Sequence, residues 1–199
     1  QQPADLAAIE KITHHLAPRG PDACGFHSSG PMAFGHRRLK VMDLEPASGQ
    51  PMIDHQLGLT LVFNGAIYNY PELRQELQAL GYQFHSDGDT EVLLKGYHAW
   101  GEQLLPKLNG MFAFAIWERD RERLFLARDR LGIKPLYLSQ DGARLRFAST
   151  LPALLAGGGV DTSLDPVALN HYLNFHAVVP APRTLLCGVE KLPPATWLR

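Results

Sequence analysis

The sequence predicts a single α+β domain with antiparallel strands in the middle and helices on the outside. Apolar runs of strand length recur along the chain, as in residues 57–63 and 108–118, and tight turns join several of them. Segments with apolar residues at helical spacing flank these runs. The 199 residues suffice to bury a sizeable core, and no internal repeat or low-complexity linker divides them.

The helices are predicted from apolar spacing and from the signals at their ends. Residues 4–16 have helical spacing and are followed by Pro18. Asn69 is expected to cap a second helix that starts at Pro71 and stops at Gly81. A third helix is expected from Asp89 or Thr90 to about Gly101, and short helices at 151–159 and 165–173. The expected core stripes are Leu6, Ile9, Ile12 and Leu16 in the first helix and Leu73, Leu77 and Leu80 in the second.

The strands are predicted from alternation and from buried apolar runs. Residues 31–43 are compatible with a strand, and residues 57–63 form a buried strand that delivers Asn64. Residues 82–85 also resemble a strand, and residues 108–118 and 124–129 indicate a central antiparallel hairpin. The remaining strands are expected on either side of the turn at Gly132 and after the turn at Asp141 and Gly142.

The composition argues against several classes of function. A formal net charge of −1 provides no basic field for nucleic acid and no acidic tail. No apolar run approaches the ~18 residues of a membrane span, and the N-terminus lacks the features of a signal peptide. Cys24 and Cys187 fit no disulfide or zinc spacing, and the His residues assemble no metal site by spacing. We therefore expect a cytoplasmic protein that binds a small molecule or another protein surface.

The stretch from Leu57 to Asn69 has the features of an oxyanion site. An apolar strand that runs into Asn64-Gly65 aims a backbone N–H and a side-chain amide at one point, where a developing negative oxygen can be held. Arg37 and Arg38 are adjacent on a predicted strand, so they point to opposite faces and only one of them can face a site.

Two acidic residues have simple structural explanations. Asp22 can pair with Arg19 across the turn at Gly20 and Pro21. Asp89 stands where an aspartate usually caps a helix. On spacing alone, both explanations compete with a role in binding.

Seven separated motifs carry a family resemblance that covers essentially the whole chain. They occur in the order RGPD at 19–22, GHRRL at 35–39, NGAIYN at 64–69, DGDTEV at 87–92, NGMFAFAIW at 109–117, ARDRLGIKPLY at 127–137 and KLPP at 191–194. In this order the chain resembles class II glutamine amidotransferases, and it is most similar to the N-terminal domain of the asparagine synthetase type. It is also similar to N-acetylglutaminylglutamine amidotransferases.

The resemblance implies a fold and a reaction. The fold is a four-layer αββα Ntn-hydrolase sandwich with antiparallel sheets. The domain hydrolyses glutamine to glutamate and ammonia through a cysteine thioester, and passes the ammonia to a synthetase domain of the same chain. ATP and Mg would belong to that synthetase domain, and no cofactor is expected in residues 1–199. A homodimer is compatible with the resemblance.

The resemblance also implies roles for individual residues. Asn64 and Gly65 match the oxyanion donors, Arg38 matches the residue that binds the α-carboxylate of glutamine, and Asp89 matches the partner of its α-ammonium. The rest of the substrate pocket is expected from Leu39, Lys40, Val41, Met42 and Ala66.

The sequence departs from the family pattern at three places. The nucleophile of the family is the first residue of the mature chain, and the Cys-Gly-Ile motif is expected about five to ten residues before Gln1, roughly one strand length. Ala66 stands where glutamate is usual, and Thr150 where an acidic residue is common. Three hypotheses follow: a glutaminase domain whose first strand precedes Gln1, a degenerate module that serves a synthetase partner as a scaffold, or a stand-alone small-molecule binding protein, which the sequence supports least.

Overall fold

The largest sheet of the molecule has five antiparallel strands in the order β10-β6-β5-β4-β3. This computed structural model describes residues 3–41 and 43–199. The strands are β3 (Met52–Asp54), β4 (Leu59–Ile67), β5 (Gly110–Glu118), β6 (Arg123–Arg128) and β10 (Trp197–Leu198). The expected central hairpin is the β5–β6 pair, in which Ala113 lies opposite Arg128 and Glu118 opposite Arg123. In β4 the strand does not stop before Asn64 but continues to Ile67.

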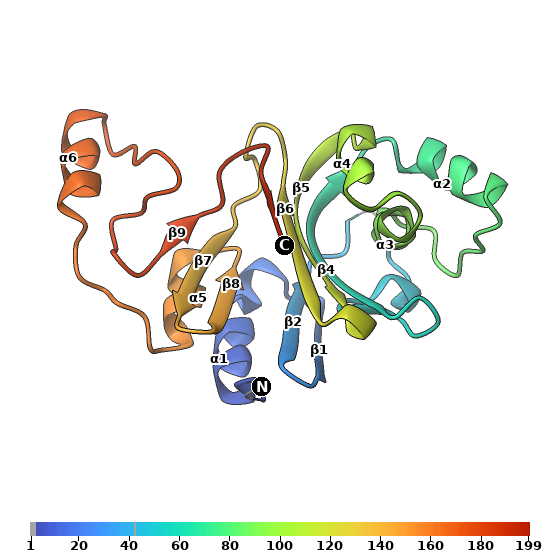
Figure 1. Cartoon of the computed structure of the whole chain (residues 1–199), viewed down its shortest axis with the longest axis horizontal. Coiled ribbons are helices and arrows are strands. Elements are labelled where there is room, and N and C mark those ends of the chain that lie inside the picture. The colour runs from blue at the N-terminus through green and yellow to red at the C-terminus, as the bar shows by residue number, and fades with distance from the viewer. Residues whose placement is uncertain (1–2, 42) are drawn as a thin grey trace.

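A second layer of strands lies across from the five-stranded sheet (Figure 1). It consists of the hairpin β1–β2 and of a three-stranded sheet in the order β8-β7-β9. The strands are β1 (Ala23–Ser29), β2 (Met32–Arg38), β7 (Tyr137–Asp141), β8 (Arg144–Ala148) and β9 (Glu190–Lys191). Within the described part of the chain, β2 pairs only with β1 and β8 only with β7, so each has one edge without a strand partner.

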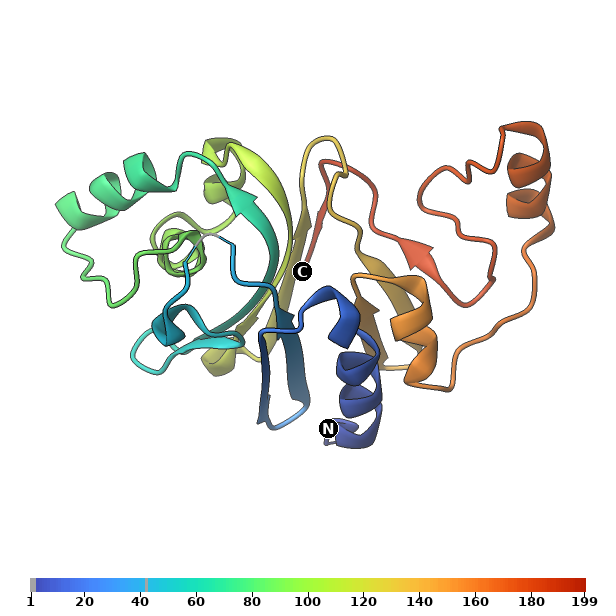
Figure 2. The ribbon, with the colours of Figure 1, turned by 180° about the vertical axis from the view of Figure 1, so that it is seen from behind.

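Helices cover the outer faces of both strand layers (Figures 1 and 2). The helices α2 (Tyr70–Ala79), α3 (Asp89–Trp100) and α4 (Leu104–Lys107) lie on the five-stranded sheet, and α1 (Leu6–His15) and α5 (Leu151–Ala156) lie on the other layer. The last helix, α6 (Pro166–Asn174), lies at the end of the molecule opposite α2. Short 3-10 turns occupy Ala17–Arg19, Pro46–Ser48, Gly101–Gln103 and Arg119–Arg121. The expected four-layer αββα order is confirmed.

Three apolar clusters join neighbouring layers of the four-layer fold. The largest joins the inner side of α2 and α3 to one face of β4 and β5, where Leu61, Phe63 and Phe114 point. The second joins the two strand layers and includes Phe34 of β2, Val62 of β4 and residues of β5 and β7. The third joins α1 and α5 to the β7–β8 layer. Successive residues of β4 therefore point to opposite faces, as an extended strand requires.

Several sequence-based expectations about local structure were wrong. Residues 82–85 form a loop, because side chains of α2 and α3 take up the polar groups of this segment. Leu80 and Leu6 are exposed rather than part of the core stripes, since each lies at a helix end where the stripe leaves the sheet. Asn69 occupies the N-cap position of α2, but its side chain instead bonds Lys107 O at 2.9 Å and Asn109 N at 2.8 Å.

Two further residues acquire explanations that the sequence did not provide. Thr150 is the N-cap of α5, and its hydroxyl accepts a hydrogen bond from Ala153 N at 3.3 Å. An acidic side chain would meet the same requirement. Asp22 makes no ion pair with Arg19 among the described residues; its carboxylate accepts a hydrogen bond from Lys40 N at 2.8 Å and so fixes the segment that follows β2.

Candidate active site

A cavity of about 1370 Å³ lies between the two strand layers and contains most of the predicted site residues. Its walls are β2, β8, the inner side of α1 and the face of β4 and β5 that includes Asn64 and Ala66. The unpaired edges of β2 and β8 both border it. Pockets for small ligands usually measure about 300 to 1,000 Å³, so this cavity has room for more than one amino acid.

One edge of β4 supplies hydrogen-bond donors to this region. Beyond Leu61 the strand has β5 on one side only, because β3 is short. The N–H groups of Phe63 and Ile67 point away from β5 and are held by side chains, by Gln50 Oε1 at 2.6 Å and by Asp89 Oδ2 at 2.9 Å. Since strand residues alternate in direction, the N–H of Gly65 points the same way, between these two. Among the described residues, no side chain or carbonyl accepts a hydrogen bond from it.

The side chain of Asn64 provides a second donor beside it. Asn64 points to the cavity face of β4, and its Nδ2 is buried without a hydrogen-bond partner among the described residues. A buried amide donor with no partner costs about 1–3 kcal/mol, so a ligand oxygen that accepts from it would gain correspondingly. Asn64 and Gly65 therefore present two adjacent free donors, which is the arrangement an oxyanion requires.

Gly65 has a steric reason to be glycine. A Cβ at this position would overlap Met111 O of the neighbouring strand and approach Phe63 Cε2 to 2.7 Å. The close approach of β4 and β5 here keeps the backbone of Gly65 accessible from the free edge. Any side chain would push the N–H away from its present place.

Arg38 is buried at the end of β2 and borders the same cavity. It is 8% exposed, and its guanidinium donates to two backbone carbonyls, Glu45 O at 2.9 Å and Asp43 O. These bonds fold the segment after β2 back over the site, and they leave other N–H groups of the guanidinium available. Arg37 also borders the cavity, and its Nε is buried without a partner among the described residues. Both arginines therefore border the cavity, so the expectation that only one of them can face a site was wrong; Arg38 is buried and Arg37 is half-buried.

Asp89 is the most unusual charged group of the site. It is 4% exposed, and Gly88 rather than Asp89 occupies the N-cap position of α3, so the expected capping position was wrong by one or two residues. Its carboxylate bonds the N–H of Ile67, and burial raises its pKa above the usual value, partly offset by backbone hydrogen bonds. No Lys, Arg or His pairs with it in the described part of the chain. A buried carboxylate without a cation is a suitable partner for a ligand ammonium.

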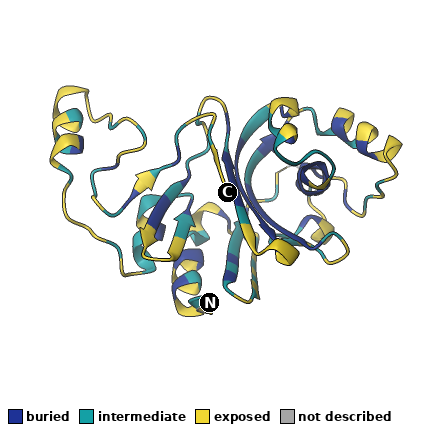
Figure 3. Cartoon of the chain, viewed as in Figure 1, coloured by how far each residue is buried: buried dark blue, intermediate teal, exposed yellow. Residues whose placement is uncertain are grey.

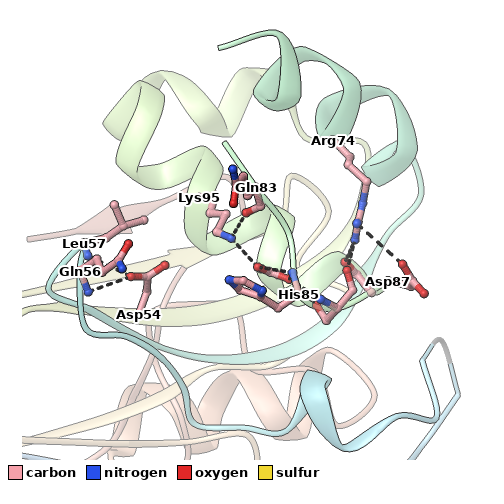
Figure 4. Close-up of polar contacts among 11 residues, drawn as sticks. Asp54, Gln56, Leu57, Arg74, Gln83, His85, Asp87 and Lys95 are labelled. Carbon is pink, nitrogen blue, oxygen red and sulfur yellow. Dashed lines mark hydrogen bonds and ion pairs between the residues drawn. The ribbon is translucent and has the colours of Figure 1, made fainter. Parts of the chain in front are cut away.

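The loop before Asp89 is held by a buried ion pair, Glu91 with Lys95 (Figure 4). Glu91 also accepts hydrogen bonds from His85 N at 3.0 Å and from both the N–H and hydroxyl of Ser86 at 2.7 Å. Lys95 donates in turn to Gln83 O. The pKa of Glu91 is lowered, because these bonds outweigh the burial of its carboxylate.

The same loop is also held from α2. Arg74 donates to Ser86 O at 2.6 Å and to Gly88 O at 3.3 Å (Figure 4). Its guanidinium also lies 4.4 Å from the centre of the Phe84 ring. Gly88 packs against Asp43 and Ser48, which belong to the segment that Arg38 holds. Arg38 and Asp89 are therefore linked through two segments that contact each other.

His36 lies on β2 within the cavity wall and remains neutral. Burial of the imidazole lowers its pKa to about 4, although a hydrogen bond with the backbone of Phe63 acts in the opposite direction. Its Nδ1 has no partner among the described residues. His36, Gln50 and Glu91 are site residues that the sequence reasoning did not single out. Glu91 and His36 each had a usable signal, their places in the DGDTEV and GHRRL motifs, whereas Gln50 had none.

The remaining predicted pocket residues divide into three groups. Leu39, Val41 and Ala66 border the cavity. Lys40 is not among the bordering residues, and its backbone N–H is occupied by Asp22. Met42 lies outside the described residues. Cys24 and Cys187 are exposed, and neither borders the cavity.

A model of a known domain family matches residues 1–199, and its description is glutamine amidotransferase domain. The chain belongs to this family. The match spans the whole sequence, so both strand layers and all the residues above lie within the amidotransferase domain.

Curated relatives of the amidotransferase domain are considerably longer than it is. Asparagine synthetase [glutamine-hydrolyzing] 1 of Bacillus subtilis is 42% identical over 188 residues, which are 94% of this chain and 29% of the relative. Asparagine synthetase [glutamine-hydrolyzing] 3 of the same organism is 37% identical and matches 94% of this chain and 31% of the relative. Asparagine synthetase B [glutamine-hydrolyzing] of Escherichia coli is 39% identical over 74% of this chain and 26% of the relative. The chain thus spans less than a third of the length of these proteins.

The fold of the amidotransferase domain also resembles solved structures. Glutamine phosphoribosylpyrophosphate amidotransferase from B. subtilis, solved with ADP and GMP, has a TM-score of 0.67 at 23% identity over 79% of this chain and 42% of its own. This likeness concerns the fold alone. Among the described residues of the domain, no helix has the length and apolarity to cross a bilayer, and no group of three or more His, Cys, Asp or Glu side chains is placed to hold a metal ion.

Proposed function

We propose that this domain hydrolyses glutamine to glutamate and ammonia through a cysteine thioester. The observation that carries the proposal is the pair of free donors, Asn64 Nδ2 and Gly65 N–H, at the edge of a buried cavity. They would stabilise the tetrahedral oxyanion that forms when a thiolate attacks the side-chain amide. Arg38 would bind the α-carboxylate of glutamine, and Asp89 its α-ammonium. Leu39, Val41 and Ala66 would line the pocket.

The nucleophile of this proposal is a cysteine on a strand that precedes Gln1. Such a strand fits the cavity, because the free edges of β2 and β8 face it and could both pair with an extended segment. Ala4 N donates to Gly30 O, so the chain enters α1 beside the turn between β1 and β2. A strand that leads into α1 would run antiparallel to β2 and begin near Arg38. Its first residue would then lie at the end of the cavity where Arg38 and Asn64 are.

The ammonia would pass to a synthetase domain of the same polypeptide. The length and names of the relatives support this partner, since the matched residues make up only 26–31% of asparagine synthetases from two organisms. ATP and Mg would be bound by that domain. Its acceptor would be a carboxylate that ATP activates for attack by ammonia.

A second candidate function rests on Ala66. A methyl group borders the cavity where glutamate is usual in the resemblance stated above, so one polar contact to glutamine is lost. This favours, more weakly, a domain that serves the synthetase as a scaffold without hydrolysing glutamine. The retention of Arg38, Asn64, Gly65 and Asp89 in one site opposes it, because a scaffold requires none of their free donors and charges.

The test is a glutaminase assay of the full-length protein and of a variant in which the proposed nucleophile, the cysteine on the strand before Gln1, is replaced by alanine. Glutamate release by the parent protein and its loss in the variant would support the proposal. No glutamate release by the parent, or unchanged release by the variant, would refute it and favour the scaffold. Ala66→Glu tests the second candidate. If the parent protein releases no glutamate and the variant does, the missing glutaminase activity is due to the alanine at this position.

A further inference from the structure

A patch of exposed apolar side chains covers α6 and the residues around it. It consists of Leu164, Val167, Tyr172, Leu173, Phe175 and Val178. Leu173 is 72% exposed although it lies within a helix. In the views of Figures 1 and 3, α6 stands away from the sheets with much of its surface exposed. Contiguous exposed apolar side chains of this kind mark interaction surfaces in folded proteins.

The patch is held in a defined conformation. Asp165 caps α6 by accepting from Val167 N at 2.8 Å and Ala168 N at 3.1 Å, and its other carboxylate oxygen pairs with Arg183. Thr184 donates its hydroxyl hydrogen to Val189 O at 2.8 Å and so closes the loop that returns from α6. A surface that is preorganised in this way loses little conformational entropy when a partner covers it.

The patch is separate from the cavity described above. The residues that border the cavity end at Ser149, so none of the six patch residues contributes to it. The exposed apolar side chains are therefore not explained by glutamine binding. They need a different partner.

The chemistry of the patch narrows the kind of partner. From Pro166 to Pro182 the sequence contains no Asp, Glu, Lys or Arg. Nucleic acids and anionic membranes are bound through clusters of Lys and Arg, which this segment lacks. An uncharged surface with Tyr, Phe and Leu has the composition of the buried centre of a protein interface.

We propose that this patch docks against the synthetase domain of the same polypeptide. This inference rests on the proposed function only in that it requires such a domain. The length of the relatives supports this occupant: the chain spans 29% and 31% of two asparagine synthetases that match 94% of it. A domain tethered in the same chain has a high effective concentration at the patch, so a modest apolar contact suffices to hold it.

The test is site-specific thiol labelling of the full-length protein, read at each position by peptide mass spectrometry. Leu173→Cys is compared with Leu80→Cys, a matched control at the end of α2, where Leu80 is 60% exposed and lies at the opposite end of the molecule. We expect labelling at position 173 to be at least about tenfold slower than at position 80, because the docked synthetase domain must move off the patch before the thiol can react. Equal rates would overturn the proposal, as would an open reading frame without a second domain.

Two further comparisons identify the occupant. Protection at position 173 that persists on dilution supports a partner in the same chain, whereas protection lost on dilution would assign the patch to a second copy and overturn the proposal. In a Val178→Cys protein, adding Leu173→Glu should restore fast labelling at position 178, and adding Leu80→Glu should not. Labelling requires no turnover, so a protein that protects position 173 but releases no glutamate would retain the docking inference and refute the glutaminase.

Discussion

The side chains of Asn64 and Asn69, five residues apart in one motif, have opposite environments. Asn64 Nδ2 has no partner among the described residues, whereas the Asn69 amide connects Lys107 O and Asn109 N. If Asn64 is an oxyanion donor, its free amide forms its hydrogen bond only in the transition state and so stabilises that state alone. Asn69, in contrast, stabilises the ends of β4 and β5 in every state of the protein.

Asn64→Ala should therefore lower kcat for glutamine hydrolysis by about 10²- to 10³-fold, or roughly 2.7–4 kcal/mol, because one oxyanion donor is lost. Its melting temperature should not fall, since no hydrogen bond of the free protein is removed and a buried amide without a partner is lost. Asn69→Ala should do the reverse, with a lower melting temperature and nearly unchanged kcat. Steady-state kinetics and thermal unfolding of both variants check this. An unchanged kcat in Asn64→Ala would remove the assigned role.

Arg38→Ala should raise KM for glutamine on the order of 10- to 100-fold, because a hydrogen bond to a charged group contributes about 1.5–3 kcal/mol. Arg37→Ala is the matched control, since the neighbouring arginine borders the same cavity. If KM rises in Arg37→Ala and stays normal in Arg38→Ala, the free Nε of Arg37 binds the carboxylate and Arg38 only holds the loop after β2.

Asp89→Asn should abolish saturable glutamine binding and yet stabilise the domain at neutral pH. The pKa of Asp89 is raised by burial, so ionisation costs the folded protein stability as pH rises through the folded-state pKa. Asn has no such cost and can still accept a hydrogen bond from Ile67 N. The gain in melting temperature should be present at pH 7 and vanish below about pH 4, where both states bind the proton.

The matched control for this measurement is Asp87→Asn, since the Asp87 side chain is fully exposed two residues away. Its melting temperature at pH 7 should stay close to that of the parent, because its 3.9 Å ion pair with Arg74 is solvent-exposed and contributes only about 0–1 kcal/mol. A loss of stability in Asp89→Asn at pH 7 would show that the carboxylate is already paired favourably without ligand.

At the scale of elements, the loop between α2 and α3 depends on a buried ion pair. Glu91→Gln keeps the size of the side chain but leaves the buried Lys95 without its counter-charge. We expect a destabilisation of about 3–5 kcal/mol, the usual cost of breaking a buried pair. KM for glutamine should rise as well, because the loop that positions Asp89 loosens.

The same substitution in an exposed pair provides the control. Glu76 pairs with Lys107 at 2.7 Å with both side chains substantially exposed, so Glu76→Gln should cost only about 0–1 kcal/mol and leave KM unchanged. Chemical denaturation and kinetics compare the two. Similar losses in both variants would indicate that the Glu91 pair is not the element that holds the loop.

Periodicity and end signals predicted most elements, whereas tertiary contacts decided the rest. The helices at Leu6–His15 and Tyr70–Ala79 and the β5–β6 hairpin were confirmed because their apolar patterns are long and regular. Residues 82–85 were misread as a strand because the groups that bind their backbone, Glu91 and Lys95, come from a helix further along the chain. No local pattern contains that information.

The candidate site shows the same division. Asn64 and Gly65 could be predicted from a strand that ends in an amide and a glycine, and family resemblance added Arg38 and Asp89. The structure places these four in or beside one cavity, but their catalytic roles remain predictions. Gln50 could not be found, because its contact with the backbone of Phe63 joins two separate segments. His36 lies within the GHRRL motif, but its contact with the same backbone is visible only in the structure.

At the scale of the whole molecule, the second strand layer consists of two sheets, and the edges of β2 and β8 that border the cavity have no strand partner in the described part of the chain. In a protein that carries a preceding strand, amide protons of β2 and β8 that point into the cavity should exchange slowly with solvent. Deleting that segment should make them exchange rapidly, while β5, paired on both sides, stays protected. Hydrogen-exchange mass spectrometry checks this. Equal exchange in both proteins would show that the segment does not pair with these edges.

The last ten residues have a practical consequence for dividing the protein into parts. Glu190–Lys191 pairs with β7 and Trp197–Leu198 with β6, so one short segment contributes an edge strand to each layer. Arg128 donates to Leu192 O between these two pairings. A recombinant version cut before Glu190 would lose a strand from both layers at once and leave β6 and β7 open to aggregation. The shortest soluble version of this domain should therefore extend at least to Leu198.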